Sequence, residues 1–234
     1  IVFGDWSSDV CSSDLFNLEA MAAGVNYNNS IFSQILPFIQ KGRSVLDFGA
    51  GRGTFANRIG QHIVCVEPDV RAAAQISDKH TILSELDGLP EKSFDLIYSI
   101  NVLEHLEDDR AALNQMASLL KTSGRLYLFV PARNELYSAM DRRVGHLRRY
   151  SRRQLESMVS RAGLKVEDCT YFDCLGYVAS LLLKLFGLCF GWRGGLTSAG
   201  VGFYDSVVFP VSRRLDTIIG CVLGKNLMLK AVKP

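Results

Sequence analysis

The chain has 234 residues, of which 48% are hydrophobic and 21% are charged, enough apolar material for one large domain with a sizeable core. The formal net charge is only +2, so the composition gives no general case for nucleic-acid binding. The six cysteines form no C-x-x-C pair, which argues against structural zinc or a disulfide framework and favours a reducing cytoplasm.

Residues 1–15 differ from the rest of the chain. Their serine- and aspartate-rich centre is of low complexity and has neither a helical nor a strand period. The segment also lacks the basic start and the long apolar stretch of a signal peptide. We therefore predict that residues 1–15 are a non-native or disordered leader and leave them out of the fold.

Residues 16–40 have helical character. Ile31 and Ile35 contribute to an apolar face, and Asn29 or Ser30 is the expected N-cap. Pro37 predicts a kink or a break near the end of this helix, because proline removes a backbone donor.

The stretch 44–56 carries the most chemical information. Val45, Leu46 and Phe48 form a short apolar run typical of a buried parallel strand, and Asp47 interrupts it. Glycines follow directly at positions 49, 51 and 53, and a helix can begin after them. A strand that enters a glycine turn and then a helix makes a nucleotide site. Glycine lets the backbone approach a ligand, and the helix N-terminus offers free N–H groups.

The spacing of the glycines distinguishes two classes of cofactor. The dinucleotide fingerprint G-x-G-x-x-G needs its third glycine one residue later than Gly53, and Asp47 would repel a pyrophosphate. A carboxylate at this place suits a cationic ligand such as an amino-acid ammonium group. At these residues the chain resembles motif I of the class I S-adenosylmethionine (SAM)-dependent methyltransferases. A nicotinamide-dependent oxidoreductase is a disfavoured alternative.

Two further strands are predicted at 62–67 and 80–84. Glu67 ends the first of them, where an acidic side chain accepts hydrogen bonds from ribose hydroxyls. The resemblance implies that a carboxylate and an apolar residue after the second strand contact the adenine. The offset from Leu89 favours Glu85 and Leu86, and Asp87 is the competing carboxylate.

A fourth strand, 93–100, leads into Asn101 and then Glu104 and His105. Ligands of such sheets bind at the switch point beside the first strand. Asn101 is therefore expected at the methionine end of the cofactor, and Glu104 and His105 toward the acceptor. The predicted cofactor-binding residues are Asp47, Gly49, Ala50, Gly51, Glu67, Pro68, Glu85, Leu86 and Asn101.

A helix over 110–121 and a strand over 125–130 complete an alternation that predicts a parallel sheet with helices on both faces. The loop 131–153 should overhang the acceptor side, and long loops of this kind are usually functional. It contains Tyr137, His146 and arginines 142, 143, 148, 149, 152 and 153. Recognition of an anionic group, a solvated basic patch and contact with an anionic membrane are all open interpretations.

The end of the chain adds an insertion. A strand over 164–172 precedes residues 175–192, which are nearly all apolar apart from Lys184 and predict a buried or interfacial helix. A flexible connector over 194–202, an amphipathic helix over 207–222 and a strand over 226–232 follow. The resemblance implies that this last strand lies antiparallel between the fifth and sixth.

The predicted fold class is α/β, a doubly wound, mostly parallel seven-stranded sheet with an antiparallel last strand. The expected divisions are a SAM-binding core over 16–174, an apolar helical insertion or lid over 175–224, and the final strand over 225–234.

The resemblance implies a SAM-dependent methyltransferase, in which the protein mainly supplies proximity and orientation. The favoured acceptor is a small molecule, lipid-like or anionic, with peripheral membrane contact and no nucleic acid as partner. An alcohol or phenol acceptor needs a general base, for which His105, His146 and Tyr137 are the candidates. No metal cluster is evident in the sequence. The alternative is a SAM-binding regulatory or partner module without turnover.

Overall fold

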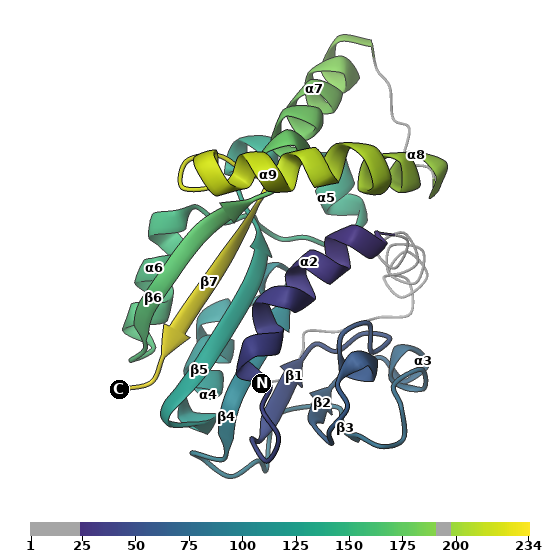
Figure 1. The fold of residues 1–234 in the computed structure, drawn as a ribbon. Coiled ribbons are helices and arrows are strands. Elements are labelled where there is room, and N and C mark those ends of the chain that lie inside the picture. The colour runs from purple at the N-terminus through teal and green to yellow at the C-terminus, as the bar shows by residue number, and fades with distance from the viewer. Residues whose placement is uncertain (1–23, 191–197) are drawn as a thin grey trace.

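The computed structural model describes residues 24–190 and 198–234, so the predicted leader 1–15 lies outside the described residues. Seven strands form one sheet in the order β3-β2-β1-β4-β5-β7-β6, with helices on both faces (Figure 1). The strands are β1 (Val45–Phe48), β2 (Val64–Val66), β3 (Thr81–Leu83), β4 (Phe94–Ile100), β5 (Leu120–Pro131), β6 (Lys165–Phe172) and β7 (Asn226–Val232).

Only β7 runs against its neighbours. It pairs antiparallel with both β5 and β6, whereas the pairs among β1 to β5 are parallel. The predicted fold class, including the place and direction of the last strand, is confirmed.

Alternating side chains of β5 supply two hydrophobic cores, since successive strand residues face opposite sides of a sheet. Leu126 and Leu128 pack in the cluster that includes residues of α4 (Asp109–Leu119) and α6 (Arg152–Arg161). Tyr127 and Phe129 pack in the cluster that includes α2 (Val25–Ile35). The sheet is therefore covered on both faces, and ligands can reach it only at its ends.

The start of α2 differs from the prediction. Asn29 and Ser30 lie inside the helix, and Gly24 at the N-cap makes no side-chain cap. The carboxylate of Asp205 takes that role from a distant part of the chain, accepting the backbone N–H of Asn26 at 2.9 Å and of Tyr27 at 2.8 Å. The predicted break is confirmed, because η1 (Leu36–Phe38) contains the proline.

The segment 131–153 is more ordered than the predicted loop. It contains η4 (Asn134–Leu136) and α5 (Ala139–Arg143), and Ser138 and Asp141 form a capping box at the start of α5. Ser151 caps α6, as its side chain accepts the N–H of Gln154. The remaining short helices of this half are η2 (Ala56–Arg58), α3 (Val70–Ala73) and η3 (Leu103–His105).

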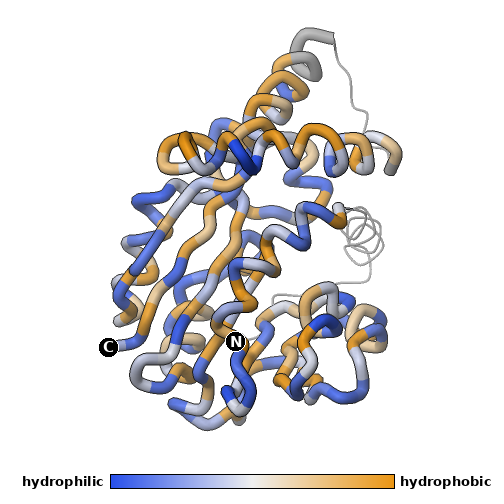
Figure 2. The backbone as a smooth tube through the Cα atoms, viewed as in Figure 1, coloured by the Kyte–Doolittle hydropathy of each residue, from blue (hydrophilic) through white to orange (hydrophobic). Residues whose placement is uncertain are grey.

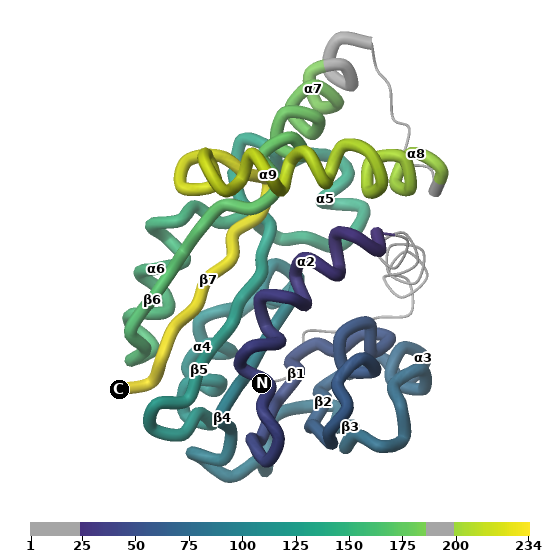
Figure 3. The backbone as a smooth tube through the Cα atoms, in the orientation of Figure 1, coloured from purple at the N-terminus to yellow at the C-terminus, as the bar shows by residue number. Residues whose placement is uncertain are grey.

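The insertion is helical. It consists of α7 (Cys174–Phe190), α8 (Ser198–Phe203), the π-helix η5 (Tyr204–Val208) and α9 (Phe209–Ile219). The flexible connector predicted over 194–202 is wrong for its second half, because α8, η5 and α9 follow one continuous path (Figure 3). No helix in the described ranges has both the length and the hydrophobicity needed to cross a bilayer.

These helices gather beyond one end of the sheet, and the coloured part of α7 and the whole of α9 carry many apolar residues (Figure 2). Exposed apolar side chains there include Leu182 on α7, 61% exposed, and Ile218 on α9, 75% exposed. Single exposed apolar residues are ordinary, but a group of them on adjacent helices indicates a contact surface.

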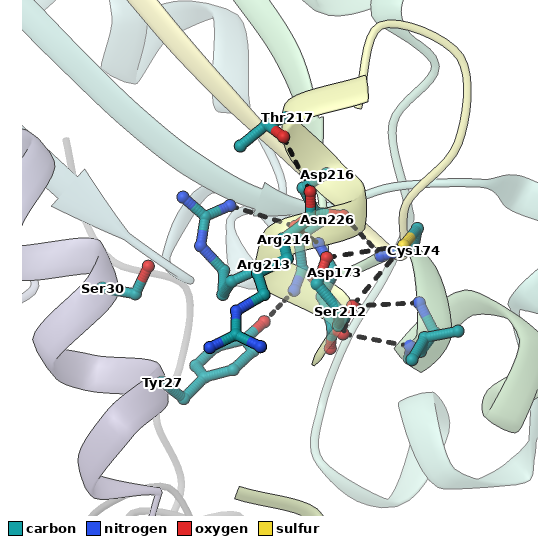
Figure 4. A network of polar contacts seen from close by, with 12 residues as sticks. Tyr27, Ser30, Asp173, Cys174, Ser212, Arg213, Arg214, Asp216, Thr217 and Asn226 are labelled. Carbon is teal, nitrogen blue, oxygen red and sulfur yellow. Dashed lines mark hydrogen bonds and ion pairs between the residues drawn. The ribbon is translucent and has the colours of Figure 1, made fainter. Parts of the chain in front are cut away.

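A buried polar network joins the insertion to the sheet (Figure 4). Asp173, directly after β6, has no exposed surface, and its Oδ1 accepts from Ser212 Oγ at 2.7 Å and from the Gly176 N–H at 3.0 Å. The hydroxyl of Tyr204 also donates to Oδ1, and Lys225 Nζ lies 3.4 Å from Oδ2. Elements α7, η5, α9 and the start of β7 therefore meet at one carboxylate.

Candidate functional site

Asp47 lies buried in β1, next to β4. The two strands pair so that Asp47 is opposite Tyr98, whose hydroxyl donates to Asp47 Oδ2 at 2.8 Å. Burial raises the pKa of Asp47 to about 7; the Tyr98 hydrogen bond opposes this shift, and the charge of Glu67 adds to it. A cationic ligand beside Asp47 would therefore favour its ionised form.

The glycine turn brings the backbone of β1 close to β2 and η3. The N–H groups of Gly49 and Ala50 both donate to the Val66 carbonyl, at 2.9 and 3.0 Å. Gly49 has φ +80°, and a Cβ built on it would lie 2.2 Å from Val102 Cγ2. No other residue fits this position without moving Val102, so the turn keeps a tight path between strand ends.

Glu67 is held against the same turn. Its Oε2 accepts the Gly51 N–H at 2.7 Å and its Oε1 accepts the Asp69 N–H at 2.9 Å. The side chain is only 7% exposed. Two carboxylates, Asp47 and Glu67, thus flank one glycine turn at the carboxyl ends of β1 and β2.

The positions of the other predicted cofactor-binding residues do not by themselves identify their roles. Leu86 is buried in the main core, Glu85 is exposed, and Asp87 accepts from Gln115 Nε2 at 3.1 Å. The choice between the two carboxylates therefore stays open. Asn101 follows β4 with φ +54°, a left-handed conformation that asparagine adopts more easily than most residues other than glycine. Pro68 is half-buried beside Glu67.

A second polar cluster lies at the end of β4. Glu104 and His105 belong to η3, and His146 follows α5. His146 Nε2 lies 3.8 Å from Glu104 Oε1, and the rings of His105 and His146 meet edge to face with centroids 4.8 Å apart. The Leu147 N–H donates to the Glu104 carbonyl at 2.8 Å, which fixes the two segments together.

Burial shifts both ionisable groups of η3 toward their neutral forms. It raises the pKa of Glu104 to about 7, against the lowering effect of His146. Burial and the neighbouring His146 lower the pKa of His105 to about 4. His105 is therefore neutral at pH 7, and its lowered pKa makes it a weaker base than an ordinary histidine. Glu104 has no exposed surface, and neither carboxyl oxygen has a hydrogen-bond partner within the described residues.

His146 is held by the segment around it. Its Nδ1 lies 3.0 Å from Asp141 Oδ1, and Arg149 Nε donates to the same oxygen at 2.8 Å. Burial would raise the pKa of Asp141, but the His146 hydrogen bond and the Arg149 charge hold it below its usual value. The Tyr137 hydroxyl donates to the His146 carbonyl at 2.8 Å, so this tyrosine helps to hold the backbone of His146.

The three predicted catalytic residues are thus brought together by the structure, although they come from two segments. Sequence reasoning missed two residues that position them or the glycine turn. Tyr98 was unassigned because only the β1–β4 register shows that it faces Asp47. Asp141 precedes His146 by five positions, which matches no regular period, and only the turn after α5 brings the two side chains together.

Much of the positive charge of segment 131–153 is neutralised within the chain. Arg148 Nη1 lies 2.9 Å from Asp109 Oδ2, Arg149 binds Asp141, and Arg152 Nε lies 2.8 Å from Glu156 Oε1. These arginines stabilise the fold of the segment, which weakens the interpretation that it recognises an anionic group.

Comparison with known proteins supports a methyltransferase relationship. A family model described as a methyltransferase domain matches residues 21–168. A probable S-adenosylmethionine-dependent methyltransferase of Mycobacterium tuberculosis is 29% identical over 142 residues, covering 56% of this chain and 52% of that protein. A ubiquinone biosynthesis O-methyltransferase of Rhodopseudomonas palustris is 28% identical over 108 residues, covering 40% of this chain and 42% of that protein. The chain thus spans about half the length of the curated relatives it matches.

Solved structures share the fold. A SAM-dependent methyltransferase from Archaeoglobus fulgidus aligns with TM-score 0.58 at 20% identity, covering 88% of this chain and 94% of that one. Phosphoethanolamine N-methyltransferase 2 of Haemonchus contortus, solved with S-adenosyl-L-methionine, aligns with TM-score 0.59 at 17% identity, covering 90% of this chain and 53% of that one. The chain belongs to the methyltransferase domain family and is a class I member, for which S-adenosyl-L-methionine is the cofactor.

Proposed function

We propose that this protein binds S-adenosyl-L-methionine at the β1–β2 glycine turn and methylates an oxygen of a small, lipid-like acceptor. The residues of the turn fit this cofactor. Asp47 offers a buried carboxylate to its ammonium group, Gly49 gives the close backbone path, and Glu67 offers oxygens near the place of a ribose diol. When bound, the cofactor supplies an electrophilic methyl group, and the chain supplies binding and orientation.

The observation that carries the acceptor class is the position of α7. Lys184 Nζ donates to the carbonyls of Glu135 and Tyr137 at 2.7 and 2.8 Å, so this apolar helix is tied to the segment that holds His146. An apolar helix tied to the segment that carries a histidine cluster suits an acceptor with an apolar tail and a hydroxyl head. The name of the Rhodopseudomonas palustris relative, an O-methyltransferase, supports oxygen as the methylated atom.

The test compares two acceptors that share a hydroxylated ring and differ only in a prenyl tail. With radiolabelled methyl SAM, the tailed acceptor should show kcat/KM at least about tenfold higher, since burying a few methylenes stabilises its complex by more than 1.4 kcal/mol. Equal kcat/KM for both would refute the lipid-like acceptor. Tight SAM binding without turnover on any hydroxyl or amine acceptor would instead favour a regulatory module.

The apolar surface of α7 and α9 also predicts peripheral membrane contact. In a flotation assay, we expect the protein to rise with phospholipid vesicles, and Leu182→Asp with Ile218→Asp to reduce the bound fraction at least about fivefold, because each charge must be desolvated. Val70→Asp is the matched control, since Val70 is 80% exposed on α3, away from this surface. Absence of flotation with and without anionic lipid would remove the membrane contact.

A further inference from the structure

We propose that Glu104, His105 and His146 form a binding site for one divalent transition-metal ion beside the cofactor site. Each residue offers one ligand atom, and the three atoms lie within 4.8 Å of one another. The cluster joins η3 to the segment after α5, which the Leu147 N–H to Glu104 carbonyl hydrogen bond holds together.

The carboxylate of Glu104 is the first reason. It has no exposed surface, and both its oxygens lack hydrogen-bond partners in the part of the chain that the structure describes. Buried acceptors almost always have a partner, so two unsatisfied oxygens on one side chain need explaining. A cation between Glu104 and His146, whose Nε2 is 3.8 Å from Glu104 Oε1, would satisfy them.

The second reason is the orientation of His146. Its Nδ1 faces the carboxylate of Asp141 at 3.0 Å, so the hydrogen-bond network assigns the proton to Nδ1. Nε2 then presents its lone pair toward Glu104 and His105. A histidine that binds a metal through one nitrogen commonly donates the other N–H to a carboxylate, and Arg149 holds this carboxylate in turn.

The donor set indicates which ions fit. Two imidazoles and one carboxylate suit Zn²⁺, Mn²⁺ or Fe²⁺, whereas Mg²⁺ and Ca²⁺ prefer oxygen ligands only. Ligands about 2.0–2.2 Å from one ion can be at most about 4.4 Å apart. The widest spacing of the cluster must therefore shorten by a few tenths of an ångström, which small side-chain rotations allow. Three protein ligands leave coordination positions for an acceptor.

The place of the cluster gives the ion a role, which rests on the proposed function. Val102, which contacts the Gly49 position of the cofactor turn, directly precedes η3. An acceptor hydroxyl bound to the ion would lose its proton to solvent more easily. Its oxygen would then form the bond to the methyl carbon, while the methyl–sulfur bond breaks and leaves its electron pair on sulfur.

The experiment is calorimetric titration of untagged, chelator-treated protein with Zn²⁺ and with Mn²⁺, without cofactor or acceptor. We expect one ion per chain, and an affinity at least about tenfold weaker in His146→Ala and in Glu104→Gln. His62→Ala is the matched control, because His62 is an exposed histidine outside the cluster and its loss should leave the affinity unchanged. Co²⁺ absorption gives a second readout, since histidine coordination changes its visible spectrum.

Two results would overturn the site: no binding of either ion by the folded wild-type protein, or equal affinity in His146→Ala. If Glu104→Gln does not fold, His146→Ala decides alone, since His146 lies nearer the surface. SAM binding measured on the same samples separates the two proposals. If the wild-type protein binds SAM but no metal ion, only the proposed metal site is refuted. If it binds no SAM, the proposed function is refuted, and the metal titration can still be interpreted.

Discussion

Replacing Asp47 with alanine should weaken SAM binding by about 30-fold or more, because truncating one partner of a buried charge pair costs about 2–5 kcal/mol. Asp47→Asn keeps the shape and an acceptor for the Tyr98 hydroxyl but removes the charge, so it should lose most of the same affinity. Calorimetry with SAM measures both variants. An unchanged affinity in Asp47→Ala would show that the cofactor does not bind at this turn.

Although Asp47→Asn should weaken SAM binding, it should stabilise the folded protein at neutral pH when no ligand is bound. The pKa of Asp47 is raised to about 7 in the folded protein, whereas the ordinary pKa of an aspartate in an unfolded chain is 3.8. Between these values the folded state holds the extra proton, so stability falls as pH rises from about 4 to 7. Asp47→Asn has no carboxyl group at this position, so its stability should not fall with pH for this reason. Urea unfolding at about pH 5 and 8 should show a smaller decrease for the variant, and identical decreases would contradict the assignment.

Asp173→Ala should destabilise the protein by about 3–5 kcal/mol, because it leaves Lys225 without its buried partner and removes the acceptor of Ser212 and Tyr204. Asp173 also has φ +65°, a conformation that alanine adopts poorly. Asp173→Asn should cost less, since asparagine tolerates this φ and keeps one acceptor oxygen.

Asp168→Ala is the matched control for this measurement. Asp168 lies in β6, shortly before Asp173, and is exposed, so its loss should change stability by no more than about 0.5 kcal/mol. Urea denaturation of the three variants gives the free energies of unfolding. A loss below about 1 kcal/mol for Asp173→Ala would mean that the network of Figure 4 contributes little to the junction.

Most strands of the sheet were predictable because they combine a short apolar run with a turn signal. The C-terminal ends of two strands were well defined by the residues that follow them. The apolar run of β1 stops at three closely spaced glycines, and β5 stops at Pro131. The place and direction of β7 came from the family resemblance, since strand order is not encoded in local periodicity. The sheet also fixed the neighbourhood of Asp47 and Glu67, because the carboxyl ends of adjacent parallel strands must meet.

Contacts between distant segments could not be predicted in the same way. The cap of α2 was assigned to Asn29 or Ser30 because capping rules act over a few residues, whereas the true acceptor, Asp205, is far along the chain. The basic segment 131–153 was expected to be an open loop because its carboxylate partners lie mostly elsewhere. Asp109, in α4, neutralises Arg148 only once both segments have folded.

The cap of α2 by Asp205 has a consequence for synthesis of the chain. Asp205 lies 179 positions after Asn26, whose N–H it accepts. At about 5–20 residues per second, a ribosome needs roughly 10–35 s to add that length. Until then the first N–H groups of α2 have only water as partners. The ring of Phe209, which packs against Tyr27 of α2, has also not yet been made. The face of the sheet under α2 therefore stays incomplete until late in the synthesis of the chain, although α2 itself is made early.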